Sequence, residues 1–241
     1  MPDAVRRRGN PVPQAEVRTM FDRIAPIYDA MNTVMTAGLD ARWRRAAAAA
    51  AALEPGGAAV DVACGSGALT RELARKVGSR GSVIGVDISD RMLEQARRRP
   101  TPAGAVRPEY RHGDAVELPL PSEAMDAVAI AFGLRNVSDY AACLAELRRV
   151  TRPGGRVVVL ELATPERGIG RAVAATWFDR VVPLLGRMAG GGSAYRYLPD
   201  SVRAYPGPAR IAHVMSDAGL VRVRWRRLWP GLVTLHVGER A

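Results

Sequence analysis

The stretch from Asp61 to Gly67 has the clearest capacity for chemistry in this sequence. It reads Asp-Val-Ala-Cys-Gly-Ser-Gly and continues an apolar run that begins near residue 58. Two glycines after a buried strand let the backbone approach a ligand closely, and a following helix would point its amino end at that ligand. Asp87 follows the next apolar run, where a carboxylate can accept hydrogen bonds from two ribose hydroxyls. These features predict a nucleoside site.

Two common nucleotide motifs do not fit this stretch. The dinucleotide fingerprint requires a third glycine where the chain has Thr70, and the Walker pattern is absent. The glycine pair alone is also found in turns that bind nothing. An acid in the first strand, Asp61, can order the loop or bind the amino group of a cationic ligand. A nucleoside derived from methionine satisfies both Asp61 and Asp87.

A parallel sheet is needed to bring these residues to one edge. Apolar runs and helical periodicity alternate along the chain, which predicts strands at 58–63, 82–87, 108–112, 125–131 and 156–162 and helices at 66–77, 90–98 and 138–150. Such alternation is typical of an α/β fold with helices on both faces of a mostly parallel sheet. Runs at 220–228 and 232–237, separated by Trp-Pro-Gly, predict a closing antiparallel hairpin.

We interpret the 241 residues as a single domain. Residues 1–16 are rich in Arg and Pro without periodicity, so we expect them to be disordered. Residues 17–55 should form helices interrupted at Pro26, the last of them over 41–53 and capped by Asp40. Residues 56–164 would form the ligand-binding core. The segment 165–216 is expected to be a lid insertion, and 217–241 the closing strands.

Composition restricts the class of protein. The net charge is +11, with arginines spread through the chain, which reflects either the source genome or attraction to an anionic membrane or nucleic acid. Cys64 and Cys143 are too few for a disulfide framework and match no metal spacing, so a cytoplasmic location is expected. No apolar run has the length of a membrane span, and we expect no signal peptide.

Longer motifs resemble one enzyme family. The likeness is carried by Met-Phe-Asp-Arg-Ile-Ala at 20–25, Tyr-Asp-Ala-Met-Asn at 28–32, Trp-Arg-Arg at 43–45, Gly-Asp-Ala at 113–115, Ala-Phe-Gly-Leu-Arg-Asn-Val at 131–137 and Tyr-Arg-Tyr-Leu-Pro at 195–199. The chain from about 17 to 238 resembles the menaquinone and ubiquinone biosynthesis C-methyltransferases, within the class I S-adenosylmethionine-dependent methyltransferases. The resemblance implies a Rossmann-like fold with a seven-stranded sheet. It also implies C-methylation of a prenylated quinol, in first place demethylmenaquinol to menaquinol.

The resemblance also implies site residues. Cofactor contacts are expected at Asp61, Ala63, Gly65, Ser66, Gly67, Asp87, Ile88, Asp114, Ala115 and Ala131. Ala131 departs from the serine of several family members. Arg135 is expected to stabilise the quinol phenolate, and Asn136 to hydrogen-bond a ring oxygen. The acceptor is expected to contact Tyr28, Phe132, Tyr195 and Tyr197. The alternatives are a surface ion pair for Arg135 and plain packing for the tyrosines.

Two questions follow from this chemistry. Arginine stays protonated, so the proton acceptor must be a water or a carboxylate, and His213 is the one histidine that we would test as a base. The isoprenoid tail suggests peripheral contact with the inner face of the cell membrane, through apolar and flanking basic lid residues, Trp177, Phe178, Val181, Leu184, Leu185, Arg171, Arg180 and Arg187. Packing of this segment onto the core or onto the second subunit of a homodimer is the alternative.

Three other functions compete with quinol methylation. One is a small-molecule methyltransferase of secondary metabolism that keeps the same framework. Another is a basic nucleic-acid-binding protein, against which the absence of a clustered basic stripe speaks, so no nucleic-acid partner is expected. A non-catalytic cofactor binder is disfavoured by the intact acids and glycines. No residue of the sequence distinguishes a naphthoquinol from a benzoquinol.

Overall fold

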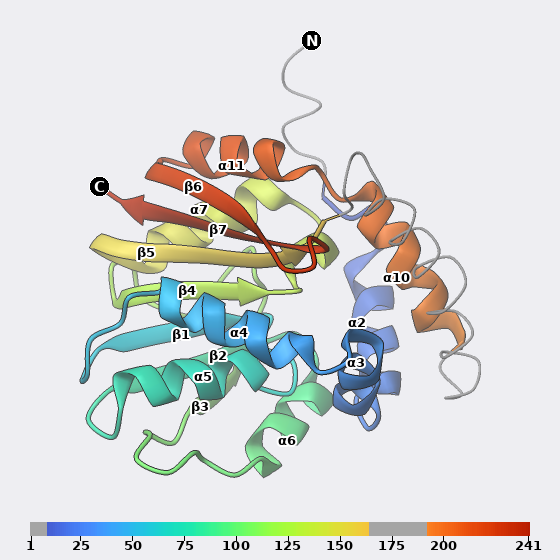
Figure 1. Ribbon diagram of the computed structural model, residues 1–241, viewed down its shortest axis with the longest axis horizontal. Helices are drawn as coiled ribbons and strands as arrows, with labels where there is room; N and C mark the ends of the chain where they lie inside the picture. The colour runs from blue at the N-terminus through green and yellow to red at the C-terminus, as the bar shows by residue number, and fades with distance from the viewer. Residues whose placement is uncertain (1–8, 164–191) are drawn as a thin grey trace.

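Seven strands form one sheet in the computed structural model, which describes residues 9–163 and 192–241, with side chains from residue 197 onward in the second range. The strand order is β3-β2-β1-β4-β5-β7-β6 (Figure 1). The strands are β1 Ala58–Val62, β2 Ser82–Asp87, β3 Glu109–His112, β4 Met125–Ala131, β5 Thr151–Leu162, β6 Leu220–Leu228 and β7 Val233–Arg240. Strands β1 to β5 pair in parallel, and β7 runs antiparallel to both β5 and β6. The expected mostly parallel sheet with a closing hairpin is confirmed.

Helices cover both faces of this sheet, as expected. On one face lie α4 (Leu39–Ala50) and α5 (Ala68–Val77), and on the other α7 (Tyr140–Val150) and α11 (Pro208–Asp217) (Figure 1). The alanine run of α4 brings that helix close to the strands, because small side chains leave little space between backbones. Strand β4 is apolar at nearly every position, which fits burial on both faces.

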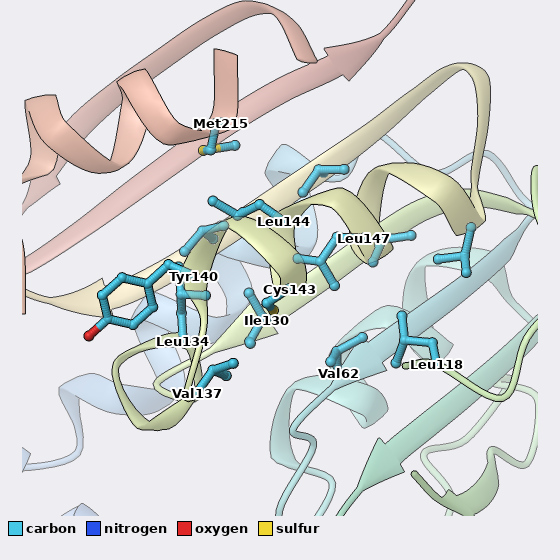
Figure 2. Close-up of a cluster of buried hydrophobic side chains, with 14 of the residues drawn as sticks. Val62, Leu118, Ile130, Leu134, Val137, Tyr140, Cys143, Leu144, Leu147 and Met215 are labelled. Carbon is cyan, nitrogen blue, oxygen red and sulfur yellow. The ribbon is translucent and has the colours of Figure 1, made fainter. Parts of the chain in front are cut away.

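The larger core cluster lies between the sheet and α7. Ile130 from β4 packs with Leu144 and Leu147 from α7, and Met215 from α11 covers them from outside (Figure 2). α7 begins at a side-chain cap, because Asp139 accepts a hydrogen bond of 3.0 Å from the backbone N–H of residue 142. The rigid contact between α7 and β4 fixes the loop that follows β4, where part of the site is located.

A second group of helices lies beyond the carboxyl ends of the parallel strands. These are α2 (Gln14–Ile24), α3 (Tyr28–Thr36), α6 (Asp90–Arg98) and α10 (Gly192–Ala204), with the short 3-10 helix η1 (Leu134–Asn136) after β4 (Figure 1). Ile24, Met35, Met92 and Val202, one from each of the four α-helices, share a small apolar cluster. The helices therefore close the edge of the sheet at which ligands of α/β proteins bind.

Three expectations about the flanking segments are wrong. α2 begins at Gln14 and Asn10 is buried, so residues 9–16 are not disordered. α4 begins at Leu39 after Gly38 in a left-handed conformation, so Asp40 lies inside the helix and caps nothing. α11, which falls in the expected lid, is a core helix whose apolar side packs against α7 and the sheet. Residues 164–191, with the remaining expected lid residues, lie outside the described part of the chain.

Candidate active site

The turn after β1 has a backbone conformation that favours glycine. Gly65 and Gly67 have φ values of 54° and 75°, in the left-handed region that glycine enters without strain. A Cβ on Gly67 would lie 2.5 Å from the hydroxyl of Tyr110, so a larger residue is excluded there. A Cβ on Gly65 would meet only a ring atom of Tyr28 at 3.9 Å, so this side of the turn is open. The turn therefore presents its backbone to an open space.

Asp87 ties this turn to the end of β2. Its Oδ2 accepts a hydrogen bond of 2.7 Å from the N–H of Gly65, and its Oδ1 accepts one of 2.9 Å from the N–H of Ser89. The carboxylate is buried, and this burial raises its pKa above the usual value. Each oxygen retains a lone pair that no backbone donor uses. Asp87 can therefore accept further hydrogen bonds from a pair of hydroxyls, as the sequence predicts.

Asp61 is held at one oxygen only. Its Oδ2 accepts a 2.6 Å hydrogen bond from the hydroxyl of Thr70, whereas its buried Oδ1 has no partner within the described residues. Burial raises the pKa of Asp61 to about 7, although the Thr70 hydrogen bond and the charge of Arg44 oppose the shift. Thr70, the residue that breaks the dinucleotide fingerprint, thus orients this carboxylate. The unpaired oxygen fits a cationic amino group.

These residues line a pocket of about 90 Å³, which we name the strand-end pocket. Of the expected cofactor contacts, it is lined by Asp61, Ala63, Gly65, Ser66, Asp87, Ile88, Ala115 and Ala131. Gly67 and Asp114 do not line it. Gly67 precedes α5 as its first capping position, and Asp114 shapes the next loop by accepting a 3.0 Å hydrogen bond from the N–H of Val116.

A second, apolar pocket of about 260 Å³ lies next to the first. It is lined by Tyr28, Asn32, Met35, Thr36, Ala37, Leu39, Asp40, Trp43, Arg44, Phe132, Arg135, Leu162, Leu198, Pro230 and Leu232. We name it the apolar pocket. It shares Tyr28, Arg44 and Phe132 with the strand-end pocket, so the two pockets meet at these three side chains. A group passing from one ligand to the other must cross this junction.

Arg135 lines the apolar pocket, and its partner is a buried glutamate. Its Nη1 donates to Oε1 of Glu161 at 2.6 Å and to the carbonyl of Phe132 at 2.6 Å. Glu161 is fully buried, so the expected alternative of a surface pair is wrong. Burial, the largest single influence, lowers the pKa of Arg135, but the attraction and hydrogen bond of Glu161, together with the electrostatic effects of Tyr28 and Tyr197, raise the pKa overall. The positive charge at this point of the pocket is therefore largely compensated.

Asn136 and Tyr197 form a hydrogen-bond network next to the apolar pocket, and neither side chain lines that pocket. The Tyr197 hydroxyl donates a 3.0 Å hydrogen bond to Oδ1 of Asn136, and the Asn10 amide donates to the Tyr197 hydroxyl. Asn136 lines the strand-end pocket, whereas Tyr197 lines neither of the two pockets. The geometry therefore does not place either residue at the second ligand. The side chain of Tyr195 lies outside the described part of the chain.

Two charged residues of the apolar pocket, Asp40 and Arg44, were not expected in the site. Arg44 donates from Nη1 to Oδ2 of Asp40 at 2.5 Å, and its guanidinium lies 5.1 Å from the centre of the Phe132 ring. Both residues belong to α4, four positions apart, which is a spacing at which opposite charges meet on a helix. That spacing is the feature of the sequence from which the pair of Asp40 and Arg44 could have been predicted. The Trp-Arg-Arg segment at 43–45 was interpreted only as a motif of the family, not as part of the site.

The remaining expectations concern histidine, metals and membranes. His213 is exposed on α11 and lines neither pocket, so its expected test as a base has no structural support. Within residues 9–163 and 192–241, no cluster of three or more metal-ligating side chains occurs, and no helix is long and apolar enough to cross a bilayer. Cys64 and Cys143 are buried and unpaired.

The fold has counterparts among solved structures. It aligns with an S-adenosylmethionine-dependent methyltransferase from Thermotoga maritima, with a TM-score of 0.65 and 19% identity over 93% of this chain and 99% of the other. A methyltransferase from Aquifex aeolicus aligns with a TM-score of 0.56 and 20% identity over 78% and 83%. The fold is that of the class I S-adenosylmethionine-dependent methyltransferases, and the strand-end pocket fits that cofactor's amino and ribose groups.

Sequence comparison is more specific than the fold. The chain belongs to the ubiE/COQ5 methyltransferase family, whose model matches residues 10–240. It is 42% identical to the demethylmenaquinone methyltransferase of Thermus thermophilus, over 92% of this chain and all of the relative. It is also 42% identical to that of Deinococcus radiodurans, over 93% and 92% of the two chains. The resemblance seen in the motifs is thereby confirmed, and the chain is an S-adenosylmethionine-dependent methyltransferase.

Proposed function

We propose that this enzyme methylates a ring carbon of demethylmenaquinol and forms menaquinol. The observation that carries the proposal is the junction of two pockets at Tyr28, Arg44 and Phe132. One pocket presents acids and backbone to a nucleoside, and the other offers an apolar cavity of about 260 Å³ with aromatic walls to a ring. Relatives named demethylmenaquinone methyltransferase support the naphthoquinol over a benzoquinol.

The strand-end pocket positions the cofactor, which supplies an electrophilic methyl group. Asp87 would accept the ribose hydroxyls, and the unpaired Oδ1 of Asp61 would accept a hydrogen bond from the amino group. Binding a cation favours the charged form of Asp61, whose pKa of about 7 in the free enzyme leaves it partly protonated at neutral pH. The backbone of the glycine turn sets the depth of the ligand.

The apolar pocket prepares the acceptor. A ring carbon of a quinol becomes nucleophilic when the neighbouring hydroxyl ionises, and a phenol has a pKa of about 10. Lowering this pKa to about 7 requires roughly 4 kcal/mol, which a cation in a poorly hydrated pocket can supply. Arg44 and Arg135 both line the pocket. The oxidised quinone lacks the hydroxyl, so the enzyme should act only on the reduced form.

Exposed apolar side chains near the apolar pocket suggest where the prenyl tail would leave it. Trp229 is 70% exposed and follows β6 next to Pro230, and Val34 is 56% exposed on α3, which also lines the pocket. Exposed apolar side chains beside a lipid-tail site favour peripheral contact with a membrane surface. Flotation with anionic vesicles checks this part. Binding no greater than that of a Trp229→Ser, Val34→Ser variant would contradict it.

The main test uses labelled S-adenosylmethionine with demethylmenaquinol and, separately, a demethylated benzoquinol, under anaerobic conditions. We expect label to enter the naphthoquinol faster than the benzoquinol. The oxidised form of each acceptor is the control and should take up no label. Label in the oxidised form alone would contradict the mechanism. Label in neither quinol would exclude respiratory quinones as substrates and favour an acceptor from secondary metabolism.

A further inference from the structure

Quinol methylation requires a group that accepts the hydroxyl proton, and the apolar pocket contains one candidate. Among the described residues that line it, Asp40 is the sole carboxylate, and no histidine lines either pocket. Asp61 and Asp87 line only the strand-end pocket. Glu161 does not line the apolar pocket, and its oxygens accept from two N–H groups of Arg135 and from Leu162. If the proposed function is correct, the proton acceptor is therefore to be sought at Asp40.

The carboxylate of Asp40 has an oxygen available for a ligand. Oδ2 accepts from Arg44, whereas Oδ1 lies 3.2 Å from the hydroxyl of Thr36. That hydroxyl has only one proton, and it lies closer to the carbonyl of Asn32, at 2.8 Å. Oδ1 can therefore accept a stronger hydrogen bond from a bound hydroxyl than the one that Thr36 provides.

The backbone between α3 and α4 fixes this arrangement. Residues Ala37 and Gly38 both adopt left-handed conformations, with φ values of 49° and 76°, and reverse the chain between Thr36 and Leu39. The first turn of α4 is thereby directed into the pocket, with Asp40 and Arg44 one turn apart on the same side. The side chains are 16% and 9% exposed, so water has limited access to the pair.

Arg44 lies where negative charge would develop. The methyl group must cross the junction of the two pockets, so the reacting ring carbon and its neighbouring hydroxyl must lie near Tyr28, Arg44 and Phe132. Within the described chain, the Arg44 guanidinium makes one hydrogen bond, to Asp40, which leaves N–H groups for an oxyanion. Arg135 differs, since Glu161 does not line the pocket and would keep its compensating charge, whereas a proton transferred to Asp40 would leave the charge of Arg44 uncompensated.

We propose that Asp40 is the base of the reaction and that Arg44 stabilises the resulting oxyanion. The O–H bond of the ring hydroxyl breaks, its proton passes to the Asp40 carboxylate, and the electron pair stays on oxygen beside Arg44. After the methyl group has been added, the ring carbon loses its hydrogen to water and Asp40 returns its proton to the oxygen. One proton is released in each turnover. The other ionisable side chains facing the pocket are Tyr28 and Arg135.

The first experiment measures kcat against pH for Asp40→Asn. We expect a loss of about 100-fold or more at pH 7, because general-base catalysis typically contributes that much. Turnover should then recover as the pH rises and the quinol ionises by itself. Glu94→Gln is the matched control, since Glu94 pairs with Arg98 four residues away on an exposed face of α6. A uniformly lowered profile of unchanged shape, or a loss below twofold, would overturn the proposal.

A second measurement does not depend on turnover. The ionisation of bound 1-naphthol is followed by its absorption change in the wild-type enzyme, Asp40→Asn and Arg44→Leu. Removing the carboxylate should lower the pH midpoint, since Arg44 then acts unopposed, and removing the cation should raise it. Thermal unfolding and calorimetric cofactor binding check that each variant is folded. Midpoints that do not move in opposite directions, or a wild-type enzyme that does not bind 1-naphthol, would overturn the assignment.

The two experiments separate this assignment from the proposed substrate. Opposite shifts of the 1-naphthol midpoint together with no methylation of any quinol would retain the Asp40–Arg44 pair and reject the quinol acceptor. Methylation of demethylmenaquinol by the wild-type enzyme with unshifted midpoints would retain the acceptor and reject the pair.

Discussion

The two pockets that meet at Phe132 are built in different ways. The strand-end pocket takes most of its lining from turns at the carboxyl ends of neighbouring strands, and its acids are held by backbone N–H groups or by Thr70. The apolar pocket is assembled from α3, α4, η1, the end of β5, α10 and the turn before β7. Its charged groups are arginine–carboxylate pairs in apolar surroundings. One pocket thus depends mainly on short motifs at the strand ends, and the other on elements that are far apart in the sequence.

This difference separates the consequences of mutation. In the strand-end pocket, a change of charge should alter cofactor affinity and its dependence on pH. In the apolar pocket, removing the buried counter-charge of Arg135 should affect stability, a change of charge at Asp40 or Arg44 should affect turnover, and a change of volume should affect the acceptor alone. The following variants, in order of decreasing effect, test whether the pockets are independent in this sense.

Glu161→Gln should have the largest effect. The substitution leaves the buried guanidinium of Arg135 without its counter-charge, and breaking a buried ion pair in this way costs about 3–5 kcal/mol in the free energy of unfolding. Urea denaturation at pH 7 measures the loss. Glu94→Gln, which breaks the exposed ion pair between Glu94 and Arg98, is the control and should change stability by less than about 0.5 kcal/mol. A loss below 1 kcal/mol in Glu161→Gln would show that Arg135 is hydrated.

Asp61→Asn should stabilise the cofactor-free protein above pH 7. The pKa of Asp61 is raised from 3.8 to about 7, so between these values the folded state keeps a proton that the unfolded state has lost. Stability therefore falls as the pH rises through this window, by an amount on the order of 4 kcal/mol. Denaturation of both proteins at pH 4 and pH 8 measures it, and the variant should lack this decrease.

The same variant tests the ligand side of Asp61. Cofactor affinity of the wild-type enzyme should fall about tenfold per pH unit below pH 7, because the cation requires the charged carboxylate. The affinity of Asp61→Asn should be weaker at pH 8 and nearly independent of pH. Calorimetric titrations with the cofactor across pH 5 to 8 measure both affinities. Parallel pH dependences in the two proteins would show that the amino group of the cofactor does not bind at Asp61.

Leu198→Trp should affect only the acceptor. Leu198 lines the apolar pocket from α10 and does not line the strand-end pocket, so a larger side chain reduces the cavity without touching the cofactor. We expect kcat/KM for the quinol to fall about tenfold, equivalent to about 1.4 kcal/mol. Cofactor affinity should stay within twofold. Ala49→Trp, at an exposed position of α4 outside both pockets, is the control; equal losses in both variants would contradict the assignment of the cavity.

Tyr197→Phe should have the smallest effect. The substitution removes the 3.0 Å hydrogen bond to Asn136 and the acceptor of the Asn10 amide, which together hold the amino-terminal segment against η1. We expect a loss of about 1 kcal/mol in stability and little change in the acceptor's KM. A tenfold rise in KM with unchanged stability would instead place the hydroxyl in contact with the substrate.

The strand-end pocket could be predicted because the residues that define its glycine turn are contiguous in the sequence. A buried strand, a glycine pair and a helix specify one turn, and Asp87 ends the adjacent strand, so Asp61 and Asp87 followed from pattern alone. Most strand and helix boundaries in this region matched within two residues for the same reason, but β5 begins at Thr151 instead of residue 156, and β7 ends at Arg240 instead of residue 237. Gly67 and Asp114 were assigned to the ligand but shape the backbone, a distinction that depends on atomic positions.

The apolar pocket could not be predicted in this way, because its contacts are distant in sequence. Asp40 was interpreted as a cap, yet the left-handed Gly38 is the cap and the helix begins two residues earlier. The side of α4 that faces the pocket depends on a 2.9 Å hydrogen bond from Trp43 to the carbonyl of Trp229. The partner of Arg135 had one signal, a glutamate in the apolar strand β5, since a buried charge requires a counter-charge.

The position of β7 has a consequence for synthesis. This strand follows β6 in the sequence but is inserted between β5 and β6 in the sheet. A nascent chain that has emerged only as far as β6 therefore has two unpaired strand edges, and it lacks Leu232, which lines the apolar pocket. Strands β1 to β5 can pair before that point. On the ribosome, the cofactor half of the enzyme can thus form before the acceptor half, and a stalled chain would expose edges prone to aggregation.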